Sequence, residues 1–265
     1  MGELGAAPNL NDLKTYAEIG RALWADPSRS GEMAIETLSA IALLNLTHER
    51  ALEKASQALL DRAVRQGMAS NTVSALEFGQ FGAFFKLQPE ERFVLVGLHL
   101  GRWTYERTAR VLQTKPEVVE ALAWRARSQI GISQGLTPIG AKIASPNCPE
   151  YDLDRPWTQR FLDEEMGTGR EAIFLRNHLM ACDSCRRSLA RCRDIYFRVE
   201  SLLPRVADDD GILQVLAQVS KEGKKLHSPG DYTFGDSLAA FFGQRSIQIL
   251  LFLVFALVIY RLRHA

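Results

Sequence analysis

One short string of the sequence limits the fold more than any other, because His178, Cys182 and Cys185 lie within eight residues. His178 and Cys182 are four residues apart, so on a helix they would share one face. Cys182 and Cys185 enclose two residues, a spacing that lets both sulfurs reach one ion. A structural zinc ion takes four ligands in a tetrahedron, and this string offers three of them.

Cys148 is the fourth ligand that we expect, thirty residues before His178. The segment between them predicts a helix over 157–166, a glycine-containing break and a second helix from Arg170. Two antiparallel helices would return the chain to Cys148. The sequence therefore predicts a structural Zn²⁺ bound by Cys148, His178, Cys182 and Cys185. The alternative is a set of buried, redox-inert cysteines beside a surface histidine.

Two neighbouring features fit this interpretation. Cys192 falls on an apolar stripe with Leu189 and Val199, so it is predicted to be a small core residue. A catalytic zinc is disfavoured because no acid–base residue is placed to activate water. Glu164 and Glu165 fit a solvated helix face better than a site. The clustering of cysteines also indicates metal binding in a reducing compartment rather than a disulfide framework.

The string Phe161-Leu162-Asp163-Glu164-Glu165-Met166, followed by the His-x3-Cys-x2-Cys pattern of 178–185, resembles the zinc-binding anti-sigma factor domain. The resemblance covers about fifty residues from Cys148 and departs from the family at Glu165, where glycine is usual. It implies a small helical domain that grips a bacterial sigma factor, often beside a membrane anchor. Some members release their partner when the thiolates are oxidised, so the resemblance also implies a redox-responsive site.

Residues 87–130 predict a second compact helical unit. Pro89 with two following acids is a helix start. Thr104 is the expected N-cap of a second helix. A short turn over 113–115 follows, and Pro116 opens a third helix. A helix, a tight turn and a helix form the geometry that places one helix in a DNA major groove.

This unit resembles region 4 of sigma factors of the extracytoplasmic-function type, through 104–112 and through Val119 with 125–127. The resemblance makes Lys115, Arg125 and Arg127 the candidate DNA contacts. The family's basic or hydroxyl run is replaced here by 120–122, which reads Glu-Ala-Leu. An acid at Glu120 would repel phosphates. The alternative is a three-helix module for protein contact, with both arginines on a solvated face.

The end of the chain is strongly apolar from Ile247 to Tyr260. With its flanking residues, 244–262, it predicts one transmembrane helix that arginines at both ends extend by snorkelling. The basic residues before it favour an N-terminal bulk on the cytoplasmic side of the inner membrane. The alternative is a buried terminal helix.

Helical periodicity dominates the whole chain and alternating strand patterns are absent, so the predicted fold class is all-α. We expect the following organisation: a helical region over 1–86, the helix-turn-helix unit over 87–130, a linker over 131–147, the zinc domain over 148–203, a juxtamembrane region over 204–243 and the membrane helix over 244–262. Region 2 of a sigma factor is not recognisable in 1–86.

The functional expectation is a membrane-anchored regulator of bacterial transcription initiation, whose zinc domain controls a sigma factor or the sigma-like unit of its own chain. The expected partners are a sigma factor or RNA polymerase, the membrane and, for the helix-turn-helix unit, DNA. Two alternatives stay open: a divergent sigma-like DNA-binding factor and a membrane scaffold for protein contacts. The net charge of +1 gives no bulk attraction to polyanions. An enzyme is not expected, because phosphate-binding loops and activated nucleophiles are missing from the sequence.

Overall fold

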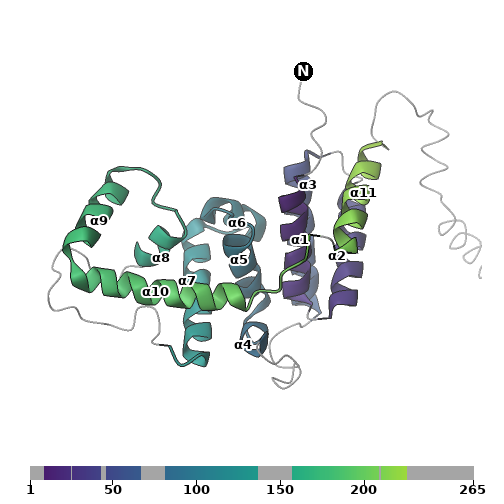
Figure 1. The fold of residues 1–265 in the computed structure, drawn as a ribbon. Coiled ribbons are helices and arrows are strands. Elements are labelled where there is room, and N and C mark those ends of the chain that lie inside the picture. Colours follow the sequence, from purple (N-terminus) through teal and green to yellow (C-terminus); the bar gives the residue numbers. More distant parts are fainter. Residues whose placement is uncertain are drawn as a thin grey trace, which may run out of the picture. The chain divides into compact units, whose positions relative to one another are not determined.

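The computed structural model describes residues 9–24, 26–42, 46–66, 81–136, 157–208 and 210–225. Within these ranges the chain forms eleven helices and no strand, which confirms the predicted all-α class. Figure 1 shows the helices α1 (Leu10–Leu23), α2 (Pro27–Ala42), α3 (His48–Arg65), α4 (Gly82–Phe85), α5 (Pro89–His99), α6 (Tyr105–Leu112), α7 (Pro116–Ser133), α8 (Trp157–Leu162), α9 (Arg170–Ala181), α10 (Asp183–Ser201) and α11 (Gly211–Lys225). The chain up to Gly223 forms one compact unit.

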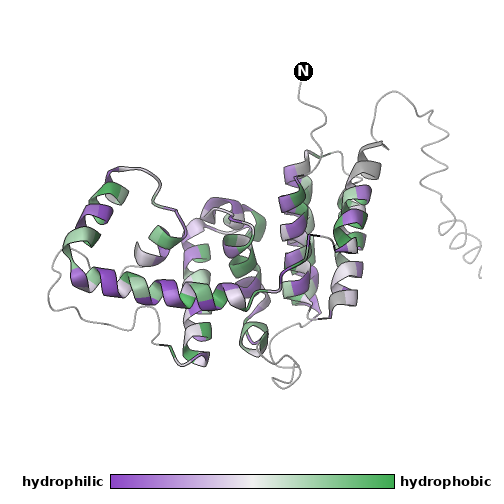
Figure 2. Cartoon of the chain, in the orientation of Figure 1, coloured by the Kyte–Doolittle hydropathy of each residue, from purple (hydrophilic) through white to green (hydrophobic). Residues whose placement is uncertain are grey.

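The first three helices pack against one another, and α1 also packs along α5. Asn9 begins α1, where its side chain accepts a hydrogen bond from the Asn11 N–H at 3.1 Å. These helices carry both apolar and polar residues, as Figure 2 shows, and most of the residues that they bury are apolar. Buried Arg92 of α5 donates to the Ala22 carbonyl at the end of α1, at 2.9 Å. A cation placed at a helix C-terminus meets the negative end of its dipole, so this contact ties α1 to α5.

The helix-turn-helix unit, α5 to α7, has the helix starts that the sequence predicted, but α7 continues to Ser133, into the segment expected as a linker. Pro89 opens α5, and Pro116 opens α7. The Thr104 hydroxyl accepts from the Arg107 N–H at 3.1 Å and caps α6. Gln113 makes the tight turn between α6 and α7 with a φ of 52°. The buried positions of α7 include the apolar stripe Val119, Ala123, Ala126 and Ile130.

The metal module, as we call α8 to α10 with the turn that joins α8 to α9, departs from its predicted helix boundaries. The helix expected over 157–166 ends at Leu162. Glu164 has a φ of 61°, in the left-handed region, so the helix cannot continue through it. The position whose backbone suits glycine is therefore Glu164, and not Glu165, the position that the resemblance singled out.

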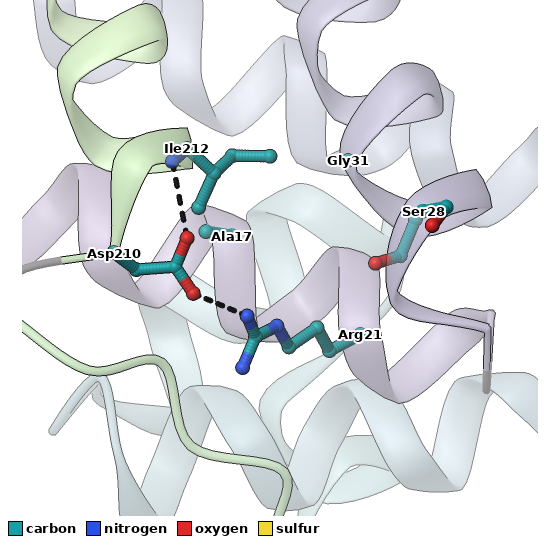
Figure 3. Close-up of a pocket in the computed structure, with 7 residues that line it drawn as sticks. Ala17, Arg21, Ser28, Gly31, Asp210 and Ile212 are labelled. Atoms are coloured by element: carbon teal, nitrogen blue, oxygen red, sulfur yellow. Dashed lines mark hydrogen bonds and ion pairs between the residues drawn. The ribbon is translucent and has the colours of Figure 1, made fainter.

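The last described helix, α11, packs where α1 and α2 meet, beside a cavity of about 220 Å³ (Figure 3). Asp210 forms an ion pair with Arg21 of α1 and accepts from the Ile212 N–H at 3.1 Å, which caps α11. A Cβ on Gly31 of α2 would lie only 2.9 Å from Cδ1 of Ile212. A side chain at this position would require the Ile212 side chain to move.

Within the described ranges, no helix combines the length and the apolar character that a membrane crossing requires. The membrane helix predicted over 244–262 lies outside the described residues.

We predict that Glu164→Gly raises the free energy of unfolding by up to about 1 kcal/mol, because glycine adopts a positive φ without steric cost. The measurement is urea unfolding of the full-length protein in neutral detergent, followed by tryptophan fluorescence. Glu165→Gly is the matched control. It should destabilise the protein, because its carboxylate makes a hydrogen bond to the Tyr105 N–H. A stabilisation by both variants would contradict the assignment of the strained position.

Candidate functional site

The three clustered ligands of the sequence meet in space. One ligand atom from each of His178, Cys182 and Cys185 can be chosen so that the three lie within 4.8 Å of one another. The Nε2 of His178 is 3.3 Å from the Sγ of Cys185. Cys185 is buried, while His178 and Cys182 are half-buried. These distances suit three ligands of one ion, so the group is a candidate metal site.

The backbone reaches this arrangement differently from the prediction that His178 and Cys182 share one helix. The helix α9 ends at Ala181, and Cys182 stands between α9 and α10 with extended backbone angles. Its N–H still donates to the His178 carbonyl at 2.8 Å. Cys185 then lies in the first turn of α10, where the positive end of the helix dipole stabilises a thiolate.

Arg186, the residue after Cys185, contacts the end of α9. Its guanidinium donates to the carbonyls of Leu179 and Met180, at 3.2 Å and 2.6 Å, and pairs with Asp183. These contacts satisfy carbonyls that the last turn of α9 leaves open. Arg186 therefore holds the α9–α10 corner on which the ligands stand.

The other two cysteines have different positions. Cys148, the predicted fourth ligand, lies outside the described residues. Cys192 is buried in the core as predicted, and its thiol lies 3.3 Å from the Thr158 hydroxyl. Burial raises the pKa of Cys192, which keeps the thiol protonated and inert. The described cysteines Cys182, Cys185 and Cys192 form no disulfide with one another.

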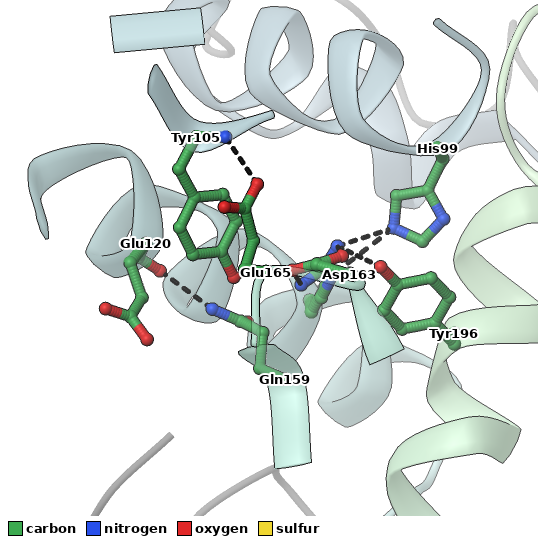
Figure 4. Close-up of polar contacts among 8 residues, drawn as sticks. His99, Tyr105, Glu120, Gln159, Asp163, Glu165 and Tyr196 are labelled. Atoms are coloured by element: carbon green, nitrogen blue, oxygen red, sulfur yellow. Dashed lines mark hydrogen bonds and ion pairs between the residues drawn. The ribbon is translucent and has the colours of Figure 1, made fainter. Parts of the chain in front are cut away.

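A buried ion pair joins the metal module to the helix-turn-helix unit. Arg127 of α7 is fully buried, and it donates through both terminal nitrogens to Asp163, at 2.8 Å and 2.7 Å. One of these nitrogens also donates to the Tyr196 hydroxyl of α10 at 2.9 Å. The guanidinium stacks 4.3 Å from the Tyr196 ring centre. Arg127, Asp163, Tyr196, His99 and Tyr105 form what we call the Arg127 cluster (Figure 4).

The other two members of the Arg127 cluster are His99 of α5 and Tyr105 of α6. The Tyr105 hydroxyl donates to Asp163 at 2.6 Å. His99 presents its Nε2 to Arg127, with distances of 3.2 Å and 3.1 Å to two guanidinium nitrogens. Arginine does not lose its proton, so this Nε2 must be the acceptor. Burial lowers the pKa of His99 well below its ordinary value of 6.5, and the charges of Arg127 and Arg102 lower it further.

Glu165 adds a second contact between the metal module and the helix-turn-helix unit, outside the Arg127 cluster. Its carboxylate accepts from the Tyr105 N–H, the first of α6, at 2.6 Å. The opening N–H groups of a helix have no partner within it, so Glu165 caps α6 from outside. Burial raises the pKa of Glu165, and this hydrogen bond opposes the rise. Glu165 therefore faces the helix-turn-helix unit and not solvent, where the sequence analysis placed it.

Glu120 of α7, which the sequence analysis placed against DNA, faces α8 instead. Its carbonyl accepts from the Gln159 side chain at 3.0 Å, and its carboxylate lies 3.7 Å from Arg160 (Figure 4). Burial raises the pKa of Glu120, while Arg160 lowers it. Farther along α7, a Cβ on Gly131 would lie 3.3 Å from Cδ1 of Ile195, so α10 packs closely there.

The predicted DNA contacts do not form one basic patch. Lys115 is exposed at the start of α7, and Arg125 is exposed along it and paired with Glu91. Arg127 points inward and has no exposed surface for a phosphate in this conformation. The exposed face of α7 carries Glu117, Val118 and Ala121 beside Arg125, so its basic character is low.

The turn over 161–166 links the metal site to the Arg127 cluster. Phe161 and Met166 pack against the small core of Leu175, Leu179 and Cys185. Asp163 and Glu165, from the same turn, reach α6 and α7. Sequence reasoning missed these two carboxylates as contact residues. The signal was present, because both belong to the string that carries the anti-sigma resemblance.

Comparisons of the chain with models of protein families, with curated proteins and with solved structures found no match.

We predict that Asp163→Ala lowers the free energy of unfolding by about 3–5 kcal/mol, because it leaves the Arg127 charge buried without its counter-ion. Urea unfolding of the full-length protein measures the change. Arg160→Ala, in the preceding helix, is the control and should cost no more than about 0.5 kcal/mol, since half of its side chain is exposed. Equal effects of the two substitutions would show that the buried pair has no special role.

His99 should make the protein less stable in mild acid. The unfolded chain takes up the His99 proton below about pH 6.5, whereas the folded chain, whose pKa is lowered, does not. Stability from this residue is therefore complete only well above pH 6.5 and falls as the pH drops through 6.5, by about 1.4 kcal/mol between pH 7.5 and 5.5. His99→Gln, which retains an acceptor for Arg127, should have a pH dependence smaller by that amount. An unchanged dependence of the unfolding free energy on pH would contradict a neutral His99.

Proposed function

We propose that the chain is a membrane-anchored regulator of bacterial transcription initiation, in which the metal module controls its own sigma-like helix-turn-helix unit. The observation that carries this proposal is the burial of Arg127 of α7 against Asp163. A residue of the predicted recognition helix thereby serves as the point of attachment for the metal module. The membrane anchor is the predicted helix over 244–262.

Zinc is the metal that fits the donor set. Two cysteine sulfurs and one histidine nitrogen are borderline-soft ligands, which zinc accepts in closed tetrahedral sites. Cys148 would supply the fourth ligand and bring the segment before α8 onto the corner of α9 and α10. A bound zinc ion would contribute folding free energy to this small module. Since Phe161 and Met166 pack on the same small core, the metal would also fix the turn that carries Asp163.

The control that we propose acts through one face of α7. The α8 and α10 helices cover the side with Glu120, Arg127 and Gly131. The opposite side, with Arg125, stays exposed. Release of the metal module would free Arg127 and the first N–H of α6 for the transcription machinery. Loss of zinc after thiolate oxidation is the expected trigger, because the module then loses its folding energy.

A protein partner is favoured over DNA as the main target. Among the exposed large apolar residues of the metal module are Ile173, Phe174, Met180 and Phe197. Exposed apolar side chains gathered on a small module are typical of protein-binding surfaces. The exposed face of α7 offers few phosphate contacts. We therefore propose RNA polymerase or a sigma factor as the partner.

We predict about one zinc ion per chain in the purified full-length protein, measured by elemental analysis. Cys182→Ser should abolish this content, and Cys148→Ser should reduce it strongly, because each removes a ligand. Cys192→Ser is the matched control and should keep the zinc, since Cys192 is buried beside Thr158 and away from the ligand group. Metal-free native protein, or zinc retained in Cys182→Ser, would refute the site.

The regulatory proposal is tested with purified RNA polymerase and DNA. Full-length wild-type protein is expected to bind polymerase weakly, whereas Asp163→Ala and the milder Asp163→Asn should bind at least about tenfold more tightly. Removal of zinc by a chelator should act in the same direction. Arg160→Ala should resemble the wild type. Gel shifts across a salt series distinguish DNA binding, whose strength falls with salt. If none of the released forms binds polymerase, sigma factor or DNA, the chain is a scaffold and the proposal fails.

A further inference from the structure

A polar cavity of about 570 Å³ lies apart from the metal ligands. It is lined by residues of α1, of the turn between α5 and α6, of the end of α10 and of the segment after it. Its volume is within the range of small-molecule sites in proteins. His99 is the member of the Arg127 cluster that borders it. The titratable side chains on its wall include Lys14, Glu18, His99, Arg102, Arg107 and Arg205.

Most cations around the cavity have a carboxylate partner. Lys14 pairs with Asp208, Arg107 with Asp12 at 3.3 Å, and Arg205 with Glu200 at 2.8 Å. Arg102 makes no ion pair with any residue in the part of the chain that the structure describes. It has a φ of 52°, a left-handed conformation that disfavours residues other than glycine. Strained backbone of this kind concentrates at functional sites. Arg102 is exposed, so its charge is available to an anion bound in the cavity.

His99 gives a second, independent indication that the cavity binds a ligand. Because its Nε2 accepts from Arg127, the neutral ring carries its hydrogen on Nδ1. This Nδ1 is buried and has no hydrogen-bond partner among the described residues. It points away from the Arg127 cluster in Figure 4. A buried donor without an acceptor costs about 1–3 kcal/mol. A ligand oxygen in the adjoining cavity would remove that cost.

The carboxylates around the cavity have partners of their own, so they do not exclude an anion. Asp12 and Glu200 are neutralised by their arginine partners. The Glu18 carboxylate accepts from the Val206 N–H at 3.3 Å. Burial raises the pKa of Glu18, whereas this hydrogen bond and the charges of Lys14, Arg205 and Arg21 lower it.

We propose that this cavity binds a small oxyanion, a carboxylate or a phosphate group, which pairs with Arg102 and accepts a hydrogen bond from Nδ1 of His99. The site joins α1, the helix-turn-helix unit and the end of α10. A ligand that binds only this arrangement stabilises it by mass action. Hydrogen bonding at Nδ1 would also make Nε2 a stronger acceptor for Arg127. The binding itself does not depend on the proposed regulatory function.

Calorimetric titration of the full-length protein in neutral detergent at pH 7.5 tests the site, with inorganic phosphate and succinate as separate probes. Sodium chloride at matched ionic strength is the reference. We expect saturable binding of one anion per chain. Arg102→Asn should weaken it at least about tenfold, since the cation is lost while asparagine tolerates the positive φ. Arg193→Gln removes an exposed charge of α10 that does not line the cavity, and should bind as the wild type does.

Nitrogen NMR of histidine-labelled protein gives a readout that does not depend on a variant folding. The Nδ1 resonance of His99 should shift on addition of the anion that binds. A response to one probe alone identifies the carboxylate or the phosphate class. A response equal to that of chloride, binding retained in Arg102→Asn, or an unshifted His99 signal would overturn the proposal and leave water as the occupant. Failure of polymerase binding would leave this result untouched.

Discussion

The contact between Arg127 and Asp163 is the interaction on which the arrangement of the described helices most depends. Both side chains are almost wholly removed from water, so neither charge could be accommodated without the other. Two tyrosines and a histidine complete the hydrogen bonding around the pair. Buried ion pairs of this kind contribute little net stability, because desolvation offsets their attraction. Their strict geometry instead fixes how α7, α10 and the turn after α8 are placed.

The candidate metal site and this ion pair are connected by one turn of the chain. The turn over 161–166 has apolar side chains on the core beside Cys185 and carboxylates on α6 and α7. A metal ion that orders the small core would therefore order Asp163 as well. This linkage gives a physical route from the state of the thiolates to the exposure of a helix-turn-helix residue, and it requires no contact between the metal and α7.

Two features of the helix-turn-helix unit that disfavour DNA binding have a structural explanation in this contact. Glu120, which would repel DNA, faces Gln159 and Arg160 of α8. Arg127, which would suit a phosphate, is the partner of Asp163. Both positions are thus adapted to a protein surface within the same chain. This supports a unit whose contacts are with protein, and whose exposed face retains few of the charges that DNA binding needs.

Local rules determined much of this protein from its sequence. Pro89, Thr104 and Pro116 set helix starts because capping and the fixed φ of proline act over a few residues. The short spacing of His178, Cys182 and Cys185 along the chain likewise placed three possible ligands close together. Helical periodicity likewise identified the buried positions Val119 and Ala123.

Only the tertiary structure decided which surfaces meet. Arg127 looks like a surface arginine in the sequence, because its burial depends on Asp163, thirty-six residues away, and on Tyr196, sixty-nine residues away. Glu165 looks solvated for the same reason, since its partner Tyr105 lies sixty residues back. The left-handed turn at Glu164, which ends α8 early, aims these acids at α6 and α7. Long-range pairing of charges depends on packing, and no local pattern encodes it.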